Sequence, residues 1–133
     1  MFEWKPEYSV QIPAIDAQHQ KLFTLARDLH AAMSQGKGKA VLESALATLI
    51  AYTKEHFANE EAFMRKNQFP DTEGHKLQHD QLTAQVVDFQ NRFTRQESCL
   101  TVELMEFLRN WLEKHISGSD QKYAAHIRGK AAA

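Results

Sequence analysis

Residues 40–66 have the sequence AVLESALATLIAYTKEHFANEEAFMRK, in which apolar side chains recur at the spacing of an α-helix. This spacing collects apolar side chains on one face of a helix, and that face must pack against other apolar surface. We expect the helix to end before Pro70, because the residue preceding a proline disfavours helical geometry. The periodic positions are Val41, Leu42, Leu46, Leu49, Ile50, Phe57 and Met64.

Three further stretches show the same helical period, and each is bounded by residues that begin or end helices. One follows Asp16, which we expect to act as an N-cap, and ends at Gly36. Another follows Asp71, and the last ends at Gly118. Their apolar positions are Leu22, Phe23, Ala26, Leu29, Met33, Leu77, Leu82, Val86, Phe89, Phe93, Leu100, Leu104, Phe107, Leu108, Trp111, Leu112 and Ile116.

Four helices of similar length with short connections predict an all-α fold, an antiparallel up-down-up-down four-helix bundle. Two prolines fall early, so we interpret residues 1–15 as an extended N-terminal arm. Polar residues 94–98 form the expected turn before the fourth helix. From about Tyr123 onward we expect a short helical turn and a frayed tail, and residues 124–133 are assigned to this C-terminal tail. Nothing marks an internal boundary, so residues 1–133 are expected to form a single domain.

The composition is that of an ordinary globular domain, with 43% hydrophobic and 25% charged residues among 133 and a net charge of -1. We expect no nucleic-acid partner, because binding phosphates requires clustered positive charge. We expect no membrane span, because no run approaches about 18 apolar residues. The first ten residues, MFEWKPEYSV, do not resemble a signal peptide, and the single cysteine, Cys99, permits no internal disulfide. These features predict a cytoplasmic location.

The chain is rich in histidine, with seven residues, and their spacing points to metal binding. His56 and Glu60 are four residues apart, as are His75 and His79. Residues four apart lie on the same face of a helix, so both side chains of each pair can reach one metal centre.

A further pair, His115 and Asp120, is five residues apart, which on a straight helix turns the two side chains about 140° from one another. We expect the helix to break at Gly118 and bring Asp120 back to the same side. In an up-down bundle these pairs, and His19 near the start of the first helix, fall at one level. The predicted cluster is therefore His19, His56, Glu60, His75, His79, His115 and Asp120.

Five imidazoles and two carboxylates predict a site for two transition-metal ions. The set exceeds the four ligands of a structural zinc, and it contains too much nitrogen for calcium or magnesium. Imidazole with carboxylate suits iron, copper or zinc. If both carboxylates bridge and one oxo or hydroxo group bridges as well, all but one of the positions around two octahedral ions are filled. The remaining position could bind a small molecule.

Other interpretations of the histidines have less support. A single histidine pair on a helix arises by chance, so the prediction depends on all the pairs together. The His-Glu-x-x-His motif of zinc proteases is absent, and no histidine follows a glutamate by three residues, as in ferritin-like di-iron proteins. We expect His30 to be a capped or core residue, His126 to be solvated, and Cys99 to be incidental.

The four motifs together resemble those of the hemerythrins, specifically the bacterial single-domain members of that family. The resemblance runs from Trp4 to about Tyr123, which is nearly the whole chain. The pieces that match are IDAQHQKLF around His19, HFANEE around Glu60, HKLQHD around His75 and His79, and WLEKHISGSD before and including Asp120.

The resemblance implies a non-haem di-iron centre with a bridging oxo or hydroxo group that binds O₂ reversibly. By carry-over, one iron is held by His75, His79 and His115. The second is held by His19 and His56 and keeps the open position, and Glu60 and Asp120 bridge the two ions. The resemblance also implies an apolar O₂ pocket made of Phe57, Met64, Trp111, Leu112 and Ile116.

An oxygen-binding metalloprotein rather than an enzyme is therefore expected, for storage, transport or delivery of O₂ to an unidentified recipient protein. One alternative is O₂ or redox sensing together with a partner. Another is a di-iron activity that consumes peroxide or handles nitric oxide. A metal store is disfavoured, because the ligand set fixes the stoichiometry at two ions. The sequence does not determine the oligomeric state.

Overall fold

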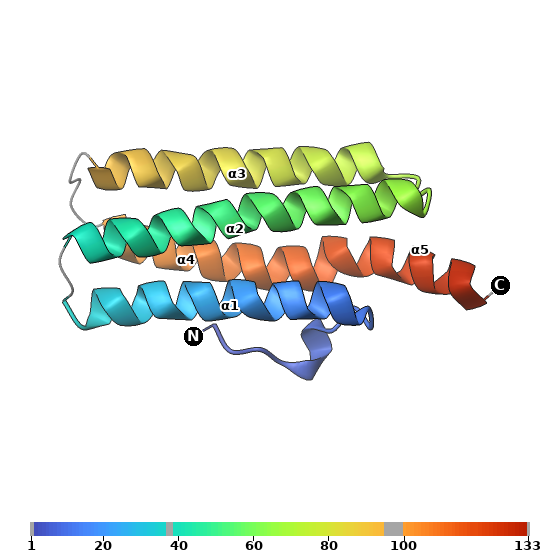
Figure 1. Cartoon of the computed structure of the whole chain (residues 1–133), viewed down its shortest axis with the longest axis horizontal. Helices are drawn as coiled ribbons and strands as arrows, with labels where there is room; N and C mark the ends of the chain where they lie inside the picture. The colour runs from blue at the N-terminus through green and yellow to red at the C-terminus, as the bar shows by residue number, and fades with distance from the viewer. Residues whose placement is uncertain (1, 37–38, 95–99, 133) are drawn as a thin grey trace.

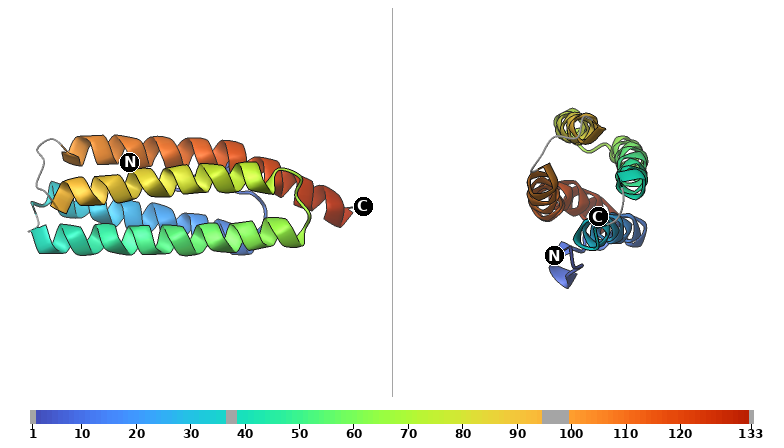
Figure 2. Two further views of the ribbon diagram at one scale, coloured as in Figure 1. Left: turned by 90° about the horizontal axis from the view of Figure 1, so that it is seen from above. Right: turned by 90° about the vertical axis from the view of Figure 1, so that its left-hand side faces the viewer.

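The computed structural model describes residues 2–36, 39–94 and 100–132, and these residues form a helical bundle. Figure 1 shows α1, α2, α3 and the α4–α5 rod running side by side, and the end-on view in Figure 2 shows them grouped around a common centre. The predicted four-helix bundle is confirmed. The elements are η1 (Pro6–Tyr8), α1 (Pro13–Ser34), α2 (Lys39–Lys66), α3 (Thr72–Thr94), α4 (Leu100–Lys114), the π-helical η2 (His115–Ser119) and α5 (Asp120–Ala132).

The predicted helix ends on either side of Pro70 agree with the structure. α2 ends at Lys66, and α3 begins directly after Asp71. The Asp71 carboxylate lies over Gly74, where a Cβ atom would come within 2.3 Å of Oδ1. Glycine at this position therefore leaves room for an acidic side chain over the first turn of α3. The predicted turn 94–98 and Cys99 lie, apart from Thr94, outside the described residues.

The last rod of the bundle corrects two predictions. The helix does not break at Gly118, because α4, η2 and α5 follow one another without interruption. Residues 124–132 are not a frayed tail but part of α5. The reason is a short apolar face, since Ala124 is fully buried and Ile127 is nearly so, and both pack beside Tyr123.

The N-terminal segment also differs from the prediction. It contains the turn of 3₁₀ helix η1, and α1 begins at Pro13, a residue favoured in the first helical turn. Asp16 is therefore not the N-cap. Its carboxylate accepts hydrogen bonds from the Ser9 hydroxyl at 2.6 Å and from the Val10 backbone N–H at 2.8 Å, so it anchors the arm to α1.

Two apolar clusters fill the bundle. The larger cluster includes Leu22 and Phe23 of α1, Phe57 of α2 and most of the inward face of α4. The smaller cluster consists of Val10, Ile15, Met64, Tyr123, Ala124 and Ile127. Two apolar positions expected on the inner faces are instead half or more exposed, Val41 and Leu77. Leu77 lies two residues from both His75 and His79, and a helix that turns both histidines inward must turn Leu77 outward.

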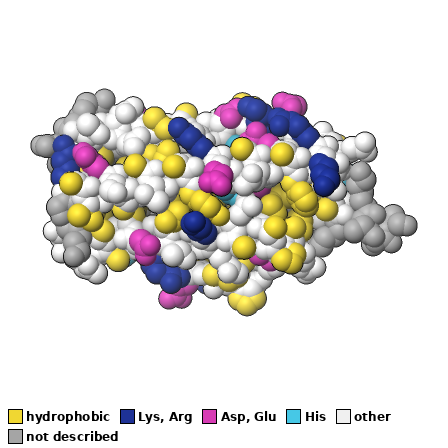
Figure 3. Space-filling view, viewed as in Figure 1, with side chains coloured by type: hydrophobic (Ala, Val, Ile, Leu, Met, Phe, Trp, Pro, Cys, Tyr) yellow, Lys and Arg dark blue, Asp and Glu magenta, His cyan; other side chains and the backbone are white. Residues whose placement is uncertain are grey.

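The surface has no single dominant charge on the face in Figure 3, where acidic and basic side chains are interspersed with apolar ones. Among the described residues, no helix combines the length and apolar character needed to cross a membrane.

Candidate metal centre

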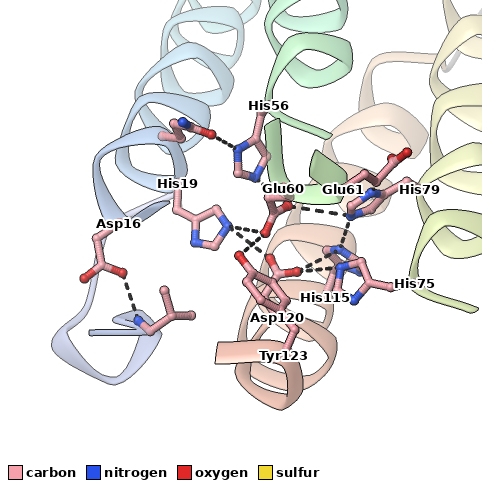
Figure 4. A network of polar contacts seen from close by, with 12 residues as sticks. Asp16, His19, His56, Glu60, Glu61, His75, His79, His115, Asp120 and Tyr123 are labelled. Carbon is pink, nitrogen blue, oxygen red and sulfur yellow. Dashed lines mark hydrogen bonds and ion pairs between the residues drawn. The ribbon is translucent and has the colours of Figure 1, made fainter. Parts of the chain in front are cut away.

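The structure brings all seven predicted cluster residues together in the interior of the bundle (Figure 4). The residues come from α1, α2, α3, η2 and α5, and every one of the seven side chains is buried, His115 being the most exposed at 7%. The cluster also separates the two apolar clusters. Along α1, for example, Ile15 belongs to the smaller one and Leu22 to the larger, with His19 between them.

Three histidine rings converge on the carboxylate of Asp120. Nε2 of His19 lies 3.0 Å from Oδ2, Nε2 of His75 lies 2.9 Å from Oδ1, and Nε2 of His115 lies 3.2 Å from the same Oδ1. The two oxygens of this carboxylate are therefore shared between opposite sides of the cluster.

Glu60 occupies the equivalent place on the other side. Its Oε1 lies 2.8 Å from Nε2 of His56 and 3.6 Å from Nε2 of His79, and its Oε2 lies 3.6 Å from Nε2 of His19. Nε2 of His79 and Nε2 of His115 also face one another at 3.1 Å. Nitrogen and oxygen atoms that converge in this way are arranged as ligands around common centres.

The cluster divides into two overlapping groups whose donor atoms lie within 4.8 Å of one another. One group holds His75, His79 and His115, and the other holds His19 and His56. Glu60 and Asp120 belong to both groups. Two carboxylates shared by two histidine groups are what a pair of adjacent cations with two bridging ligands would need.

The hydrogen bonding of these residues also fits a bound cation. Among the described residues, several buried polar atoms of the cluster have no hydrogen-bond partner: both ring nitrogens of His19, Nε2 of His75, Oε1 of Glu60 and both carboxylate oxygens of Asp120. Burying such atoms unsatisfied costs about 1–3 kcal/mol each. Bound metal ions would satisfy all of these atoms except one ring nitrogen of His19, because an imidazole offers one nitrogen to a given centre. A set of imidazoles and carboxylates suits iron, copper or zinc.

The π-helical turn η2 brings Asp120 to the cluster. The backbone N–H of Asp120 donates to the carbonyl oxygen of His115, five residues earlier, which is the hydrogen bond that defines a π-helix. The wider turn accommodates one extra residue, so His115 and Asp120 lie on the same side of the rod. The predicted outcome is correct, but a π turn rather than a helix break produces it.

Burial and neighbouring charges shift the pKa values of these groups in opposite directions. Burial lowers the pKa of His79 to about 3, which favours the neutral ring that a metal ligand requires. Burial also lowers the pKa of His19, but the carboxylates of Asp120 and Glu60 outweigh that effect and raise it to about 10. Burial and Asp120 raise the pKa of Glu60, yet the rings of His56 and His19 bring it down to about 2.

Two further side chains orient histidine rings, and sequence reasoning missed both. Nδ1–H of His56 donates to Oε1 of Gln18 at 2.6 Å, and Nδ1–H of His79 donates to Oε2 of Glu61 at 2.9 Å. Each bond leaves Nε2 free of hydrogen and directed at the cluster, an arrangement common for metal-ligating histidines. The available signal was position, because Gln18 precedes His19 and Glu61 follows Glu60 directly in the sequence.

Tyr123 was also missed. It is fully buried, and its hydroxyl donates a short hydrogen bond to Oε2 of Glu60. Burial and the adjacent Glu60 carboxylate raise the pKa of Tyr123, so the hydroxyl keeps its proton and acts as a donor. The sequence showed only that Tyr123 follows Asp120 by three residues, which places both on one side of α5.

The five residues expected to line an apolar pocket fall into two places. Phe57, Trp111, Leu112 and Ile116 belong to the larger apolar cluster. Phe57 stacks on the ring of His79 with 3.8 Å between centroids, and Trp111 meets Phe57 edge-on. Met64 is not brought together with them, because it belongs to the smaller cluster on the other side of the seven residues.

The remaining two histidines lie outside the cluster. His30 is partly buried, and its ring meets Phe2 edge-on. His126 is not solvated as predicted. It is partly buried with its ring edge-on to Phe69, and within the described part of the chain its Nε2 has no hydrogen-bond partner.

The fold and the cluster together define a four-helix bundle protein with an interior histidine–carboxylate centre suited to metal cations. Comparison with known families agrees, since the family described as "Hemerythrin HHE cation binding domain" matches residues 10–127. The chain belongs to the hemerythrin family.

Individual relatives support this assignment over most of the chain. A bacteriohemerythrin of Stenotrophomonas maltophilia (strain R551-3) is 32% identical over 125 residues, which are 94% of this chain and 80% of the relative. A bacteriohemerythrin of Methylococcus capsulatus is 31% identical over 88% of both chains. Among solved structures, a crystal structure of a hemerythrin mutant has a TM-score of 0.86 at 28% identity and covers 94% of this chain and 95% of its own.

Proposed function

We propose that this chain holds two iron ions in its interior cluster, binds O₂ reversibly there, and serves in oxygen storage, transport or delivery. The observation that carries the proposal is that the two histidine groups share both carboxylates, Glu60 and Asp120. A single ion would use one group and leave the histidines of the other without a partner.

The two groups suggest which ion keeps an open position. The group with His75, His79 and His115 offers five donors including the shared carboxylates, whereas the group with His19 and His56 offers four. If one oxo or hydroxo group bridged the two ions, the first ion would have six ligands and the second five, which would leave the second ion one position for O₂. Two ferrous ions, when bound, supply the two electrons that O₂ takes up.

The apolar side chains beside the cluster would protect this chemistry from water. Phe57, Trp111, Leu112 and Ile116 are all at most 6% exposed. They carry no ionisable group, so this wall cannot deliver the protons that cleavage of an O–O bond requires. We infer that O₂ keeps its O–O bond while bound and returns the two electrons when it leaves, so that the chain is an oxygen-binding metalloprotein rather than an enzyme.

The charge of the proposed centre is compatible with burial. Two Fe(II), two carboxylates, one hydroxide and five neutral imidazoles leave a net charge of +1. A buried charge is tolerated where each charged group is also a ligand. We further propose that the chain forms one hemerythrin-like domain, works in the cytoplasm and passes O₂ to a recipient protein.

A visible spectrum tests the proposal. The iron-loaded protein is reduced under argon, iron is counted per chain, and spectra are taken before and after exposure to air. Two irons per chain and a ligand-to-metal band that appears with O₂ and vanishes on its removal are expected. A direct change to a stable ferric spectrum would instead favour peroxide chemistry.

A matched pair of variants tests the ligand assignment. His56→Gln removes a ring from the four-donor group and should lower the iron content and abolish the reversible band. His30→Gln makes the same change outside the cluster and should leave both unchanged. Equal behaviour of the two variants would contradict the assignment.

A further inference from the structure

The two carboxylates of the cluster differ in how they are held. Glu60 receives the hydroxyl hydrogen bond of Tyr123 at Oε2, as Figure 4 shows. Asp120 receives no hydroxyl hydrogen bond within the described part of the chain, and its two oxygens instead face imidazole nitrogens at 2.9–3.2 Å. The centre is therefore asymmetric in its carboxylates as well as in its histidines.

Tyr123 is held firmly for this role. The side chain is fully buried, and its ring meets those of His75 and Phe69 edge-on, with centroids 5.4 and 6.3 Å away. These contacts involve the ring alone. The hydroxyl can therefore be removed by substitution with phenylalanine while the packing is kept.

A hydrogen bond to a carboxylate draws electron density away from it and weakens it as a metal ligand. Ferric ions depend on anionic donors more than ferrous ions do, so the bond favours the ferrous state. Hydrogen bonds around a metal site are a recognised means of tuning its reduction potential. The proposed function needs a ferrous centre that persists in air, and a neutral hydroxyl on one bridging carboxylate acts in that direction.

We propose that Tyr123 is a positioning residue that holds Glu60 and, through its hydrogen bond to Oε2, slows oxidation of the reduced centre. This proposal rests on the two-iron function proposed above. It assigns no chemical step to Tyr123, whose hydroxyl remains protonated and donating throughout.

The first test is Tyr123→Phe, with Tyr8→Phe as the matched control. Tyr8 is also buried, stacks on Phe23 and lies outside the cluster. The midpoint potential of each iron-loaded variant is measured without O₂, and the rate of oxidation in air is measured separately. Loss of the bond should shift the oxidation equilibrium of Tyr123→Phe about tenfold towards the ferric state, which corresponds to a midpoint potential lower by about 59 mV for a one-electron step. A potential indistinguishable from that of Tyr8→Phe would overturn the proposal.

A second variant should shift the midpoint potential in the opposite direction, and it keeps the proposal testable if Tyr123→Phe binds iron poorly. Incorporating 3-fluorotyrosine at position 123 keeps the side-chain shape and makes the hydroxyl a stronger donor. The potential should then rise and oxidation should slow, and an unchanged or lower potential would count against the proposal. Because the potential is measured anaerobically, failure of the O₂ test on the unmodified chain is distinguishable from failure of this one.

Discussion

Deleting Gly118 should leave the metal content of the chain intact, although Gly118 lies between two residues of the cluster. An α-helix turns about 100° per residue, so five residues of regular helix would place Asp120 about 140° from His115. The π turn removes this offset by accommodating one extra residue. With Gly118 deleted, four residues of regular helix place the same aspartate about 40° from His115, still facing the cluster.

The deletion should also change the free energy of unfolding very little. Gly118 is exposed, and a Cβ atom there would meet nothing within 4 Å, so no packing is lost. We expect the free energy of unfolding to change by less than about 1 kcal/mol, as for other surface changes. Helix α5 keeps its orientation, because a π turn is equivalent to one residue inserted into an α-helix.

The assay is metal bound per chain after iron loading, together with thermal unfolding followed by circular dichroism. An insertion of alanine after Gly118 is the matched perturbation, and it should turn α5 by about 100° and remove Asp120 from the cluster. We expect close to two irons per chain for the deletion and a clear loss for the insertion. If the deletion loses iron as completely as the insertion, the geometric reasoning is refuted.

Three further predictions concern the pocket wall, the histidine charges and the arm. Ile116→Ala should speed oxidation of the oxygenated protein in air, because it opens the apolar wall beside the cluster. Ile50→Ala is the control: it should cost a similar amount of stability, about 2–5 kcal/mol, in the same apolar cluster without changing the oxidation rate. Equal oxidation rates of the two variants in stopped-flow spectra would contradict this prediction. In the metal-free protein, burial lowers the pKa of His79 from 6.5 to about 3, so that the ring takes up a proton on unfolding between these pH values. The free energy of unfolding should therefore fall as the pH drops from 6.5 towards 4.5. Urea titrations should show this pH dependence, and His79→Gln should flatten it. Asp16→Ala removes the acceptor for Ser9 and Val10 and should destabilise the fold by about 2 kcal/mol in the same titrations, while Asp28→Ala, an exposed change of equal charge, should cost little.

The cluster residues were accessible from the sequence because their geometry is local. Two pairs have helical i,i+4 spacing, and a bundle with short connections fixes which helix levels meet. The partners of these residues were not accessible in the same way. Glu61 of α2 accepts a hydrogen bond from His79 of α3, and nothing in the sequence specifies how the facing side chains of two helices pair.

Three local patterns were interpreted wrongly for identifiable reasons. Gly118 indicates a break and a π turn equally well, since both interrupt the regular hydrogen-bond ladder. Asp16 has the residue type of an N-cap, but the preference of Pro13 for the first turn places the helix start earlier. The apolar positions after Tyr123 are too few for periodicity to be recognised, although they are enough to pack α5.

The position of the cluster between a larger and a smaller apolar cluster has a consequence for how the bundle opens. Among the described residues, the end beyond the cluster is held by the smaller apolar cluster, which has six buried side chains and is far smaller than the cluster at the other end. Regions with few buried contacts open at lower free energy than the rest of a protein. Backbone amides of α5 should therefore exchange with deuterium much faster than those of α2 before loading, and slow down once ions join the helices. Such local opening at one end would admit metal without a permanent channel, and the bound ions would then stabilise the end through which they entered.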